Sequence, residues 1–163
     1  MPNPFAGSAL YARIGNLFTR PLWRTLRAPP GFGILTTVGR KSGKLREQSI
    51  RAIRRGEQVF VVCMMGERTH WLNNIRVNPA VTIRLRAETL EGRARLIVDG
   101  AERRRAFEAY VPAVGWSDYT DYAVYHWGIP TRAKIERAHR HWFEKGIPVV
   151  IELAAPRPAA SSG

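Results

Sequence analysis

The sequence predicts an α+β protein in which about six mainly antiparallel strands form a barrel or a strongly curved sheet, with helices at its flanks. Apolar segments of strand length follow one another with few helical segments between them. The first two of these segments flank a glycine-containing turn that is typical of a hairpin. The chain of 163 residues is long enough to bury one sizeable core as a single domain.

The first half of the chain contains a helix, a hairpin and a buried strand. Residues 9–27 form an amphipathic helix that Pro21 kinks or breaks. Strands are expected over residues 34–38, 48–53 and 59–64. The third is apolar throughout and is expected to be the most deeply buried. A helix over residues 69–77 then ends before Pro79.

The second half continues the sheet and adds two helices. Strands are expected over residues 81–85 and 89–98, with Gly92 at a bulge. Asp99 and Glu102 form a capping-box pattern for a helix that ends near residue 111. An aromatic-rich segment follows, and then a helix over residues 131–145 that ends at Gly146. Residues 149–153 form the closing strand.

These elements divide the chain into three parts. Residues 1–28 form an N-terminal amphipathic helix, residues 29–153 form the barrel domain, and residues 154–163 form a tail whose composition predicts disorder. No apolar run exceeds the seven residues 59–65, which is far short of a membrane span. No secretory signal is visible, and a single cysteine suits a reducing compartment. The sequence therefore indicates a cytoplasmic protein.

The positive charge is concentrated at the N-terminal end of the chain. The net charge is +13, and residues 1–55 hold eleven Lys and Arg residues against one acid. This asymmetry indicates an anionic partner, such as a phosphorylated cofactor, nucleic acid or an anionic membrane surface, although a solvated basic face is the simpler alternative. Nucleic acid is not expected, because the aromatic residues are not interleaved with the basic cluster as stacking platforms require.

The turn between the first two strands gathers four of these cations around two glycines. Gly39 and Gly43 suit a hairpin because glycine adopts a positive φ without steric cost. The cations are Arg40, Lys41, Lys44 and Arg46. A plain hairpin does not need four mutually repelling charges, so we expect an anionic ligand to bind here.

Catalytic motifs built from side chains are missing. The sequence has no HExxH, CxxC, Walker or GxSxG motif, and His139 and His141 point away from each other on the expected helix, so no metal site is expected. Cys63 lies in an apolar strand and is expected to be a core residue. The chain is therefore either a binding protein or an enzyme whose cofactor carries the reaction.

Several motifs in order resemble the deazaflavin-dependent nitroreductase family of actinobacteria. They are "ILTTVGRKSGKLRE", "GERTHWLNNIRVNPAVTIRL", "EGRARLIVDGAERRRAFEAY" and the closing "IPVVIEL". The resemblance implies a split β-barrel related to FMN-binding barrels. It also implies the 8-hydroxy-5-deazaflavin coenzyme F-420, which carries a phosphate and an oligoglutamate tail. The expected activity is hydride transfer to a small electron-poor acceptor such as a quinone, an enone or a nitro compound.

The resemblance also implies roles for individual residues. The turn is expected to bind the phosphate and the tail, and its glycines are expected to let backbone N–H groups approach the phosphate. The turn residues are Arg40, Lys41, Ser42, Gly43, Lys44 and Arg46. Residues at the end of the third strand and in the segment and helix that follow it are expected to contact the deazaflavin: Cys63, Met65, Gly66, Trp71 and Asn74. Met64, Trp116 and Tyr119 are expected on the acceptor side. Nitroreductases of this family usually have serine in place of Met64, so quinone-like acceptors are favoured here.

Several alternatives remain open at this stage. The same turn would serve an FMN-binding or haem-binding barrel, or a basic module without enzymatic activity. Trp116 and Tyr119 form either a lid over the substrate or an aromatic core cluster. The N-terminal helix either contacts the inner face of the membrane peripherally or covers one end of the barrel. The helix over residues 131–145 reshapes the pocket or forms an interface, such as that of a homodimer.

Overall fold

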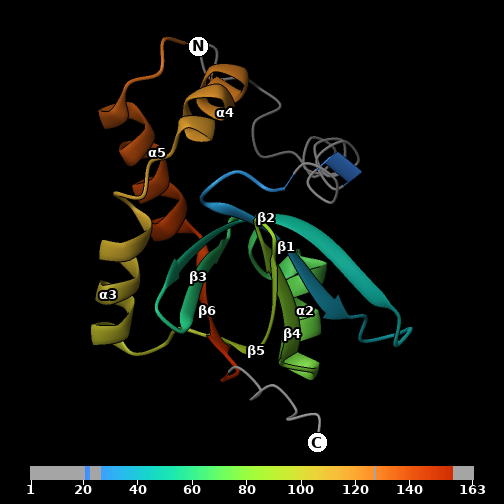
Figure 1. Cartoon of the computed structure of the whole chain (residues 1–163). Coiled ribbons are helices and arrows are strands. Elements are labelled where there is room, and N and C mark those ends of the chain that lie inside the picture. Colours follow the sequence, from blue (N-terminus) through green and yellow to red (C-terminus); the bar gives the residue numbers. More distant parts are fainter. Residues whose placement is uncertain (1–20, 23–26, 127, 156–163) are drawn as a thin grey trace, which may run out of the picture.

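In the computed structural model, which describes residues 21–22, 27–126 and 128–155, six antiparallel strands close into a barrel (Figure 1). They are β1 (Phe32–Val38), β2 (Leu45–Arg55), β3 (Gln58–Cys63), β4 (Ala80–Leu85), β5 (Glu88–Leu96) and β6 (Ile147–Leu153). Their order around the barrel is β1-β2-β3-β6-β5-β4, and β4 pairs with β1 to close it. The predicted antiparallel barrel is confirmed.

In the described part of the chain, four α-helices flank the barrel. They are α2 (His70–Val77), α3 (Gly100–Tyr110), α4 (Trp116–His126) and α5 (Arg132–Lys145). The predicted cap of α3 is confirmed, because the Asp99 side chain accepts a hydrogen bond from the backbone N–H of Glu102. The sequence does not predict α4, since its Tyr, Trp, Thr and Val residues are weak helix formers. Its start is fixed by Asp118, whose carboxylate accepts a hydrogen bond from the N–H of Gly115, as in a capping box.

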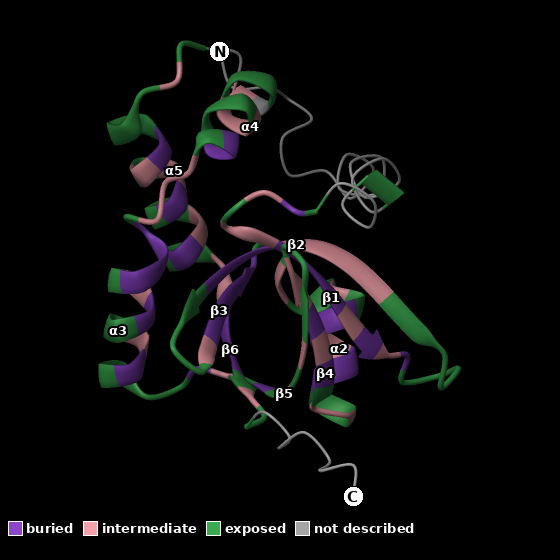
Figure 2. Ribbon diagram, in the orientation of Figure 1, coloured by how far each residue is buried: buried purple, intermediate pink, exposed green. Residues whose placement is uncertain are grey.

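After Gln58, strand β3 is apolar through Cys63, and both faces of this stretch are buried (Figure 2). Val59, Val61 and Cys63 belong to the core cluster inside the barrel. Phe60 and Val62 alternate with them and belong to a second cluster, which contains buried side chains of α3 and α5. The barrel therefore has an inner core and an outer core, and β3 contributes to both.

Helix α2 completes the inner core. Its buried residues Trp71, Leu72 and Ile75 pack with the inward-facing residues of the strands. The helix occupies the predicted range and ends before Pro79, which fits the restriction that proline places on the residue before it.

Two turns depend on a glycine with positive φ. Gly43 in the β1–β2 turn has φ +66°, and Gly56 in the β2–β3 turn has φ +58°. The expectation of a positive φ at Gly39 is wrong. Gly39 is needed there for space, because a Cβ would lie 2.9 Å from Ser42 Oγ and 3.1 Å from the carbonyl oxygen of Lys44.

Two further glycines lie where the backbones approach closely. The bulge predicted at Gly92 is wrong, since the register of β5 continues through it to both neighbouring strands. A Cβ at Gly92 would lie 2.6 Å from the carbonyl oxygen of Glu152. Gly146 ends α5 as predicted, but in an extended conformation with φ −86°. A Cβ there would lie 2.5 Å from Val62 Cγ1.

The two predicted terminal segments lie largely outside the described residues. Of the amphipathic helix expected over residues 9–27, only Pro21, Leu22 and Arg27 are described, and the first two are helical. The tail is described only as far as residue 155. Among the described residues, no helix is both long enough and apolar enough to span a membrane.

We expect Gly92→Ala to destabilise the barrel, because the added methyl group meets the backbone of β6, which cannot move without breaking strand pairing. The expected loss is about 1–3 kcal/mol of unfolding free energy, as for other overpacked sites. Gly100→Ala is the control: nothing lies within 4 Å of its Cβ position. Urea unfolding of both variants measures the difference, and equal stabilities would contradict the close approach.

Candidate functional site

The basic β1–β2 turn is held against α2 by a buried asparagine. Asn74 is 4% exposed, and its Oδ1 accepts a hydrogen bond from the backbone N–H of Arg40 at 3.1 Å. Its Nδ2 donates to Thr37 Oγ1 at 3.0 Å. The structure therefore brings together two of the predicted coenzyme-binding residues. It also gives Asn74 a role that sequence reasoning did not assign, because the amide fixes the turn on the barrel.

The four cations of the turn remain available to a ligand. Arg40, Lys41, Lys44 and Arg46 are all exposed, and in the part of the chain that the structure describes none of them has an ion-pair partner. The N–H groups of the two glycines are used within the turn. Gly39 N–H donates to the Lys44 carbonyl at 2.8 Å, and Gly43 N–H donates to the Gly39 carbonyl at 2.7 Å. The exposed side chains are therefore the main hydrogen-bond donors that the turn presents to solvent.

The chain turns outward where β3 ends. The strand stops at Cys63, one residue earlier than predicted, so Met64 and Met65 lie in the following turn and are 56% and 43% exposed. Gly66 follows with φ +63°, and its carbonyl accepts a hydrogen bond from the Cys63 thiol at 3.5 Å. Burial raises the pKa of the Cys63 thiol, which confirms its expected place in the core and makes it a poor nucleophile at neutral pH.

The three aromatic residues predicted to contact the coenzyme or the acceptor lie in two different environments. Trp71 is 8% exposed and packs into the inner core. Trp116 and Tyr119 lie on α4 and are 68% and 36% exposed. The alternative that these two rings form an aromatic core cluster is therefore wrong, and the lid remains a prediction. Among the described residues, no ring contact or hydrogen bond links either of them to Met64.

Sequence reasoning missed a cluster of buried charged and polar groups behind α4. Arg51 of β2 forms an ion pair with Asp118 of α4, and both side chains are nearly inaccessible. His139 of α5 lies beside them, with Nε2 at 3.4 Å from Asp118 Oδ1. His139 Nδ1 donates to the carbonyl of Val111 at 3.1 Å. Helices α4 and α5 are thus tied to the barrel through one arginine.

The surroundings of Arg51 satisfy most of the hydrogen-bonding capacity and the charge of its guanidinium group. The group also donates to the carbonyl of Ala113, and it lies over two rings, 5.8 Å from the Phe32 centroid and 5.2 Å from the Tyr110 centroid. The spacing of Ile135, His139 and Phe143, four residues apart on α5, is the signal that would have placed His139 inside. No comparable pattern marks Arg51.

The sequence profile of a known family matches most of the chain. The profile of F420H(2)-dependent quinone reductase matches residues 19–131. This stretch includes the basic turn, Asn74 and residues 64–66, which directly follow β3 and which we call the β3 exit. The chain belongs to this family. It is therefore a deazaflavin-dependent oxidoreductase, and coenzyme F-420 is its cofactor. The alternatives of an FMN or haem barrel and of a basic module without activity are set aside.

Similar solved structures support the split-barrel fold. One described as a domain-swapped dimer has a TM-score of 0.51 and 21% identity, covering 87% of this chain and 97% of its own. The heme storage protein HutZ from Vibrio cholerae has a TM-score of 0.52 and 12% identity, covering 83% and 90%.

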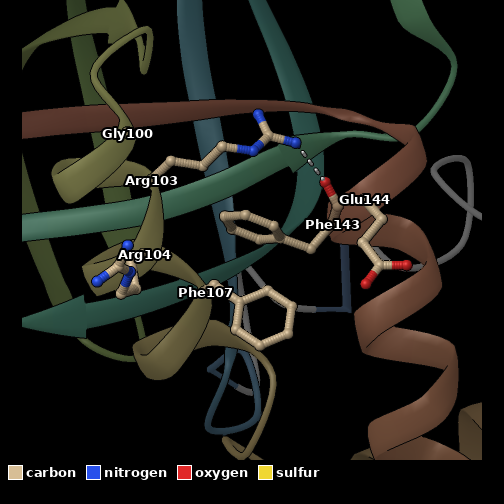
Figure 3. Close-up of a pocket in the computed structure, with 6 residues that line it drawn as sticks. All are labelled: Gly100, Arg103, Arg104, Phe107, Phe143 and Glu144. Carbon is tan, nitrogen blue, oxygen red and sulfur yellow. Dashed lines mark hydrogen bonds between the residues drawn. The ribbon is translucent and has the colours of Figure 1, made fainter.

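The enzyme also has a hollow of about 270 Å³ between α3 and α5 (Figure 3). Arg103 extends across it and donates to the carbonyl of Phe143 at 3.3 Å, near the C-terminal end of α5. The rings of Phe107 and Phe143 meet edge to face at 5.4 Å. These contacts join the two helices, so we interpret this hollow as part of their packing.

Two carboxylates of α4 have pKa values shifted in opposite directions. Burial acts to raise the pKa of Asp118, but the hydrogen bond from His139, the charge of Arg51 and the N–H of Gly115 together hold it below its usual range. Burial and the charge of Asp118 raise the pKa of Asp121 to about 6, against a smaller opposing effect of Arg51. One group stabilises the fold when ionised, and the other stabilises it when protonated.

We expect Asp118→Asn and Asp121→Asn to change stability in opposite directions at about pH 7.5. The first substitution leaves the Arg51 charge buried without its partner, so we expect the free energy of unfolding to fall by about 3–5 kcal/mol. The second substitution removes an unfavourable ionisation, so we expect the free energy of unfolding to rise by about 1–2 kcal/mol.

The gain from Asp121→Asn has a defined pH window. A raised carboxyl pKa makes the wild type lose stability as the pH rises from the usual value of 3.8 to about 6. The gain should therefore disappear near pH 4. Urea unfolding at both pH values tests this, and a shift of the same sign for both variants at pH 7.5 would contradict the assignment.

Proposed function

We propose that this enzyme reduces quinone-like acceptors, and that its β1–β2 turn binds the phosphate and the oligoglutamate tail of the deazaflavin coenzyme. The observation that carries the proposal is the group of four exposed cations without a carboxylate partner in the described chain. Their mutual repulsion is unfavourable until an anion binds. Buried Asn74 holds their turn in place, so less ordering is needed when the ligand arrives.

The side chains of the turn fit a phosphate group. Guanidinium groups form paired, charge-assisted hydrogen bonds with phosphate oxygens, which suits Arg40 and Arg46. Lysine is a more flexible point charge, which suits Lys41 for the phosphate and Lys44 for the glutamates. Open space above Gly43 leaves the turn accessible, since nothing lies within 4 Å of its Cβ position.

The β3 exit is the proposed site of the reaction. Met64 and Met65 provide an exposed surface next to Gly66, while Cys63 and Trp71 hold that segment from the core side. When bound there, the reduced coenzyme supplies the hydride. The residues of this chain orient the acceptor and exclude water, and the accompanying proton comes from the Tyr119 hydroxyl or from solvent.

The acceptor preference follows from the side chain at position 64. A thioether has no hydrogen to donate, so Met64 offers dispersion contacts and no hydrogen bond to a nitro group. Exposed Trp116 adds a large flat surface. Both features favour flat, apolar acceptors such as quinones over small polar nitro compounds.

A second copy of this chain is a further proposed partner. A structure with the same fold is described as a domain-swapped dimer, which makes a homodimer worth testing by light scattering. The residues expected to contact a membrane lie mostly outside the described part of the chain.

We expect the double variant Arg40→Ala, Lys41→Ala to weaken coenzyme binding at least about tenfold, because two charge-assisted contacts are lost. The control is Arg104→Ala, Arg105→Ala, which removes the same charge from exposed positions on α3, on the other side of the barrel (Figure 1). Fluorescence titration with the oxidised coenzyme gives both dissociation constants. If the two variants bind equally well, the turn is not the phosphate site.

We expect Met64→Ser to raise nitro reduction relative to quinone reduction, since a hydrogen bond to a charged oxygen contributes about 1.5–3 kcal/mol. The measurement is kcat/KM for a benzoquinone and a nitroimidazole, on wild type and variant, with saturating reduced coenzyme. The wild type is expected to prefer the quinone. A ratio that the substitution leaves unchanged would show that Met64 does not face the acceptor.

A further inference from the structure

A second hollow lies between α4 and α5, away from the proposed deazaflavin site. Its volume is about 280 Å³. Its lining residues come from both helices: Tyr122, His126, Lys134, Arg137, Ala138, His141 and Trp142. In Figure 1 the two helices lie on the other side of the barrel from the β1–β2 turn. We call this hollow the α4–α5 groove.

Stacked rings form one surface of the groove. The rings of Tyr122 and His126 are 4.5 Å apart at an angle of 22°, and those of His126 and Trp142 are 6.5 Å apart at 29°. Burial lowers the pKa of His126, so its imidazole is neutral at neutral pH. The three rings therefore give this side of the groove a largely apolar, aromatic lining, which suits contact with an aromatic ligand.

Basic residues line the rest of the groove. Lys134, Arg137 and His141 are exposed and lie on one stripe of α5. Lys134 Nζ donates to the Ile129 carbonyl at 3.1 Å and retains further donors. No carboxylate lines the groove. In the described chain Arg137 has no ion-pair partner, so its charge is available to an anion.

We propose that the α4–α5 groove binds a planar aromatic carboxylate. The ring system packs against the aromatic lining formed by Tyr122, His126 and Trp142, and the carboxylate pairs with Arg137 and Lys134. Ala138 has a short side chain, which leaves room for the ligand. The volume suits a ligand of one or two fused rings, smaller than most drug-sized molecules. The proposal does not depend on the site of the deazaflavin.

The probe is 2-naphthoate, and 2-naphthamide is its neutral analogue of the same shape. Isothermal titration calorimetry of the full chain is expected to show saturable binding of the naphthoate with a Kd below about 1 mM. The naphthamide is expected to bind at least about tenfold more weakly, because it cannot form the charge-assisted contacts.

Two double variants distinguish pairing of the carboxylate with Lys134 and Arg137 from a general attraction of the anion to the positive charge of α5. Lys134→Gln, Arg137→Gln is expected to weaken naphthoate binding about tenfold and to leave naphthamide binding unchanged. Arg140→Gln, Lys145→Gln removes the same charge from positions that do not line the groove, and Arg140 instead lies over the Phe107 ring. This control is expected to bind the naphthoate as the wild type does.

Ala138→Leu tests the location, because the larger side chain fills the groove while leucine keeps the helix. It is expected to abolish binding of both probes and to leave deazaflavin binding unchanged. The proposal is overturned if the wild type shows no saturable binding or if both probes bind equally. It is also overturned if either probe still binds to Ala138→Leu. The same holds if Arg140→Gln, Lys145→Gln weakens naphthoate binding as much as Lys134→Gln, Arg137→Gln does.

Discussion

Because both faces of β3 are buried, the barrel is stable only when helices cover its outer side at this strand. Val59, Val61 and Cys63 fill the barrel, whereas Phe60 and Val62 would be exposed without α3 and α5. Burying large apolar side chains contributes about 1.5–3 kcal/mol each, so the outer contacts matter as much as the inner ones. The positions of α3 and α5 follow from this constraint. In the described part of the chain, the side chains of the β1–β2 turn, on the other side of the barrel from α3, are exposed (Figure 1).

Helix α4 is held differently, through polar contacts. Its buried residues include Ser117 and Asp118, and it carries few apolar groups toward the barrel. The Arg51–Asp118 pair therefore provides an anchor that hydrophobic burial does not supply. Desolvating such a pair offsets much of its attraction, so its net contribution to stability is small, but removing one partner is costly. This interaction specifies where α4 lies, and with it the position of Trp116 and Tyr119.

The strands were predictable because each follows a pattern set by local chemistry. Alternation marks β4, the glycine turns mark the hairpins, and the capping pair at Asp99 marks the start of α3. Helix α4 and its anchor were not predictable, because Arg51 and Asp118 are 67 residues apart and neither position has a local signature. The charges of the basic turn were enough to suggest an anion site. The use of both glycine N–H groups in hydrogen bonds within the turn could not be predicted, because composition does not reveal such bonds.

The strand that organises the fold also leads into the proposed reaction site. Cys63 is the last residue of β3 and is buried, and the next residue, Met64, is 56% exposed. The change from core to surface therefore takes place across one peptide bond, and the hydrogen bond from the Cys63 thiol to the Gly66 carbonyl holds the turn that follows. A segment anchored in this way cannot shift without disturbing the inner core. The proposed acceptor surface is thus anchored by the packing of β3.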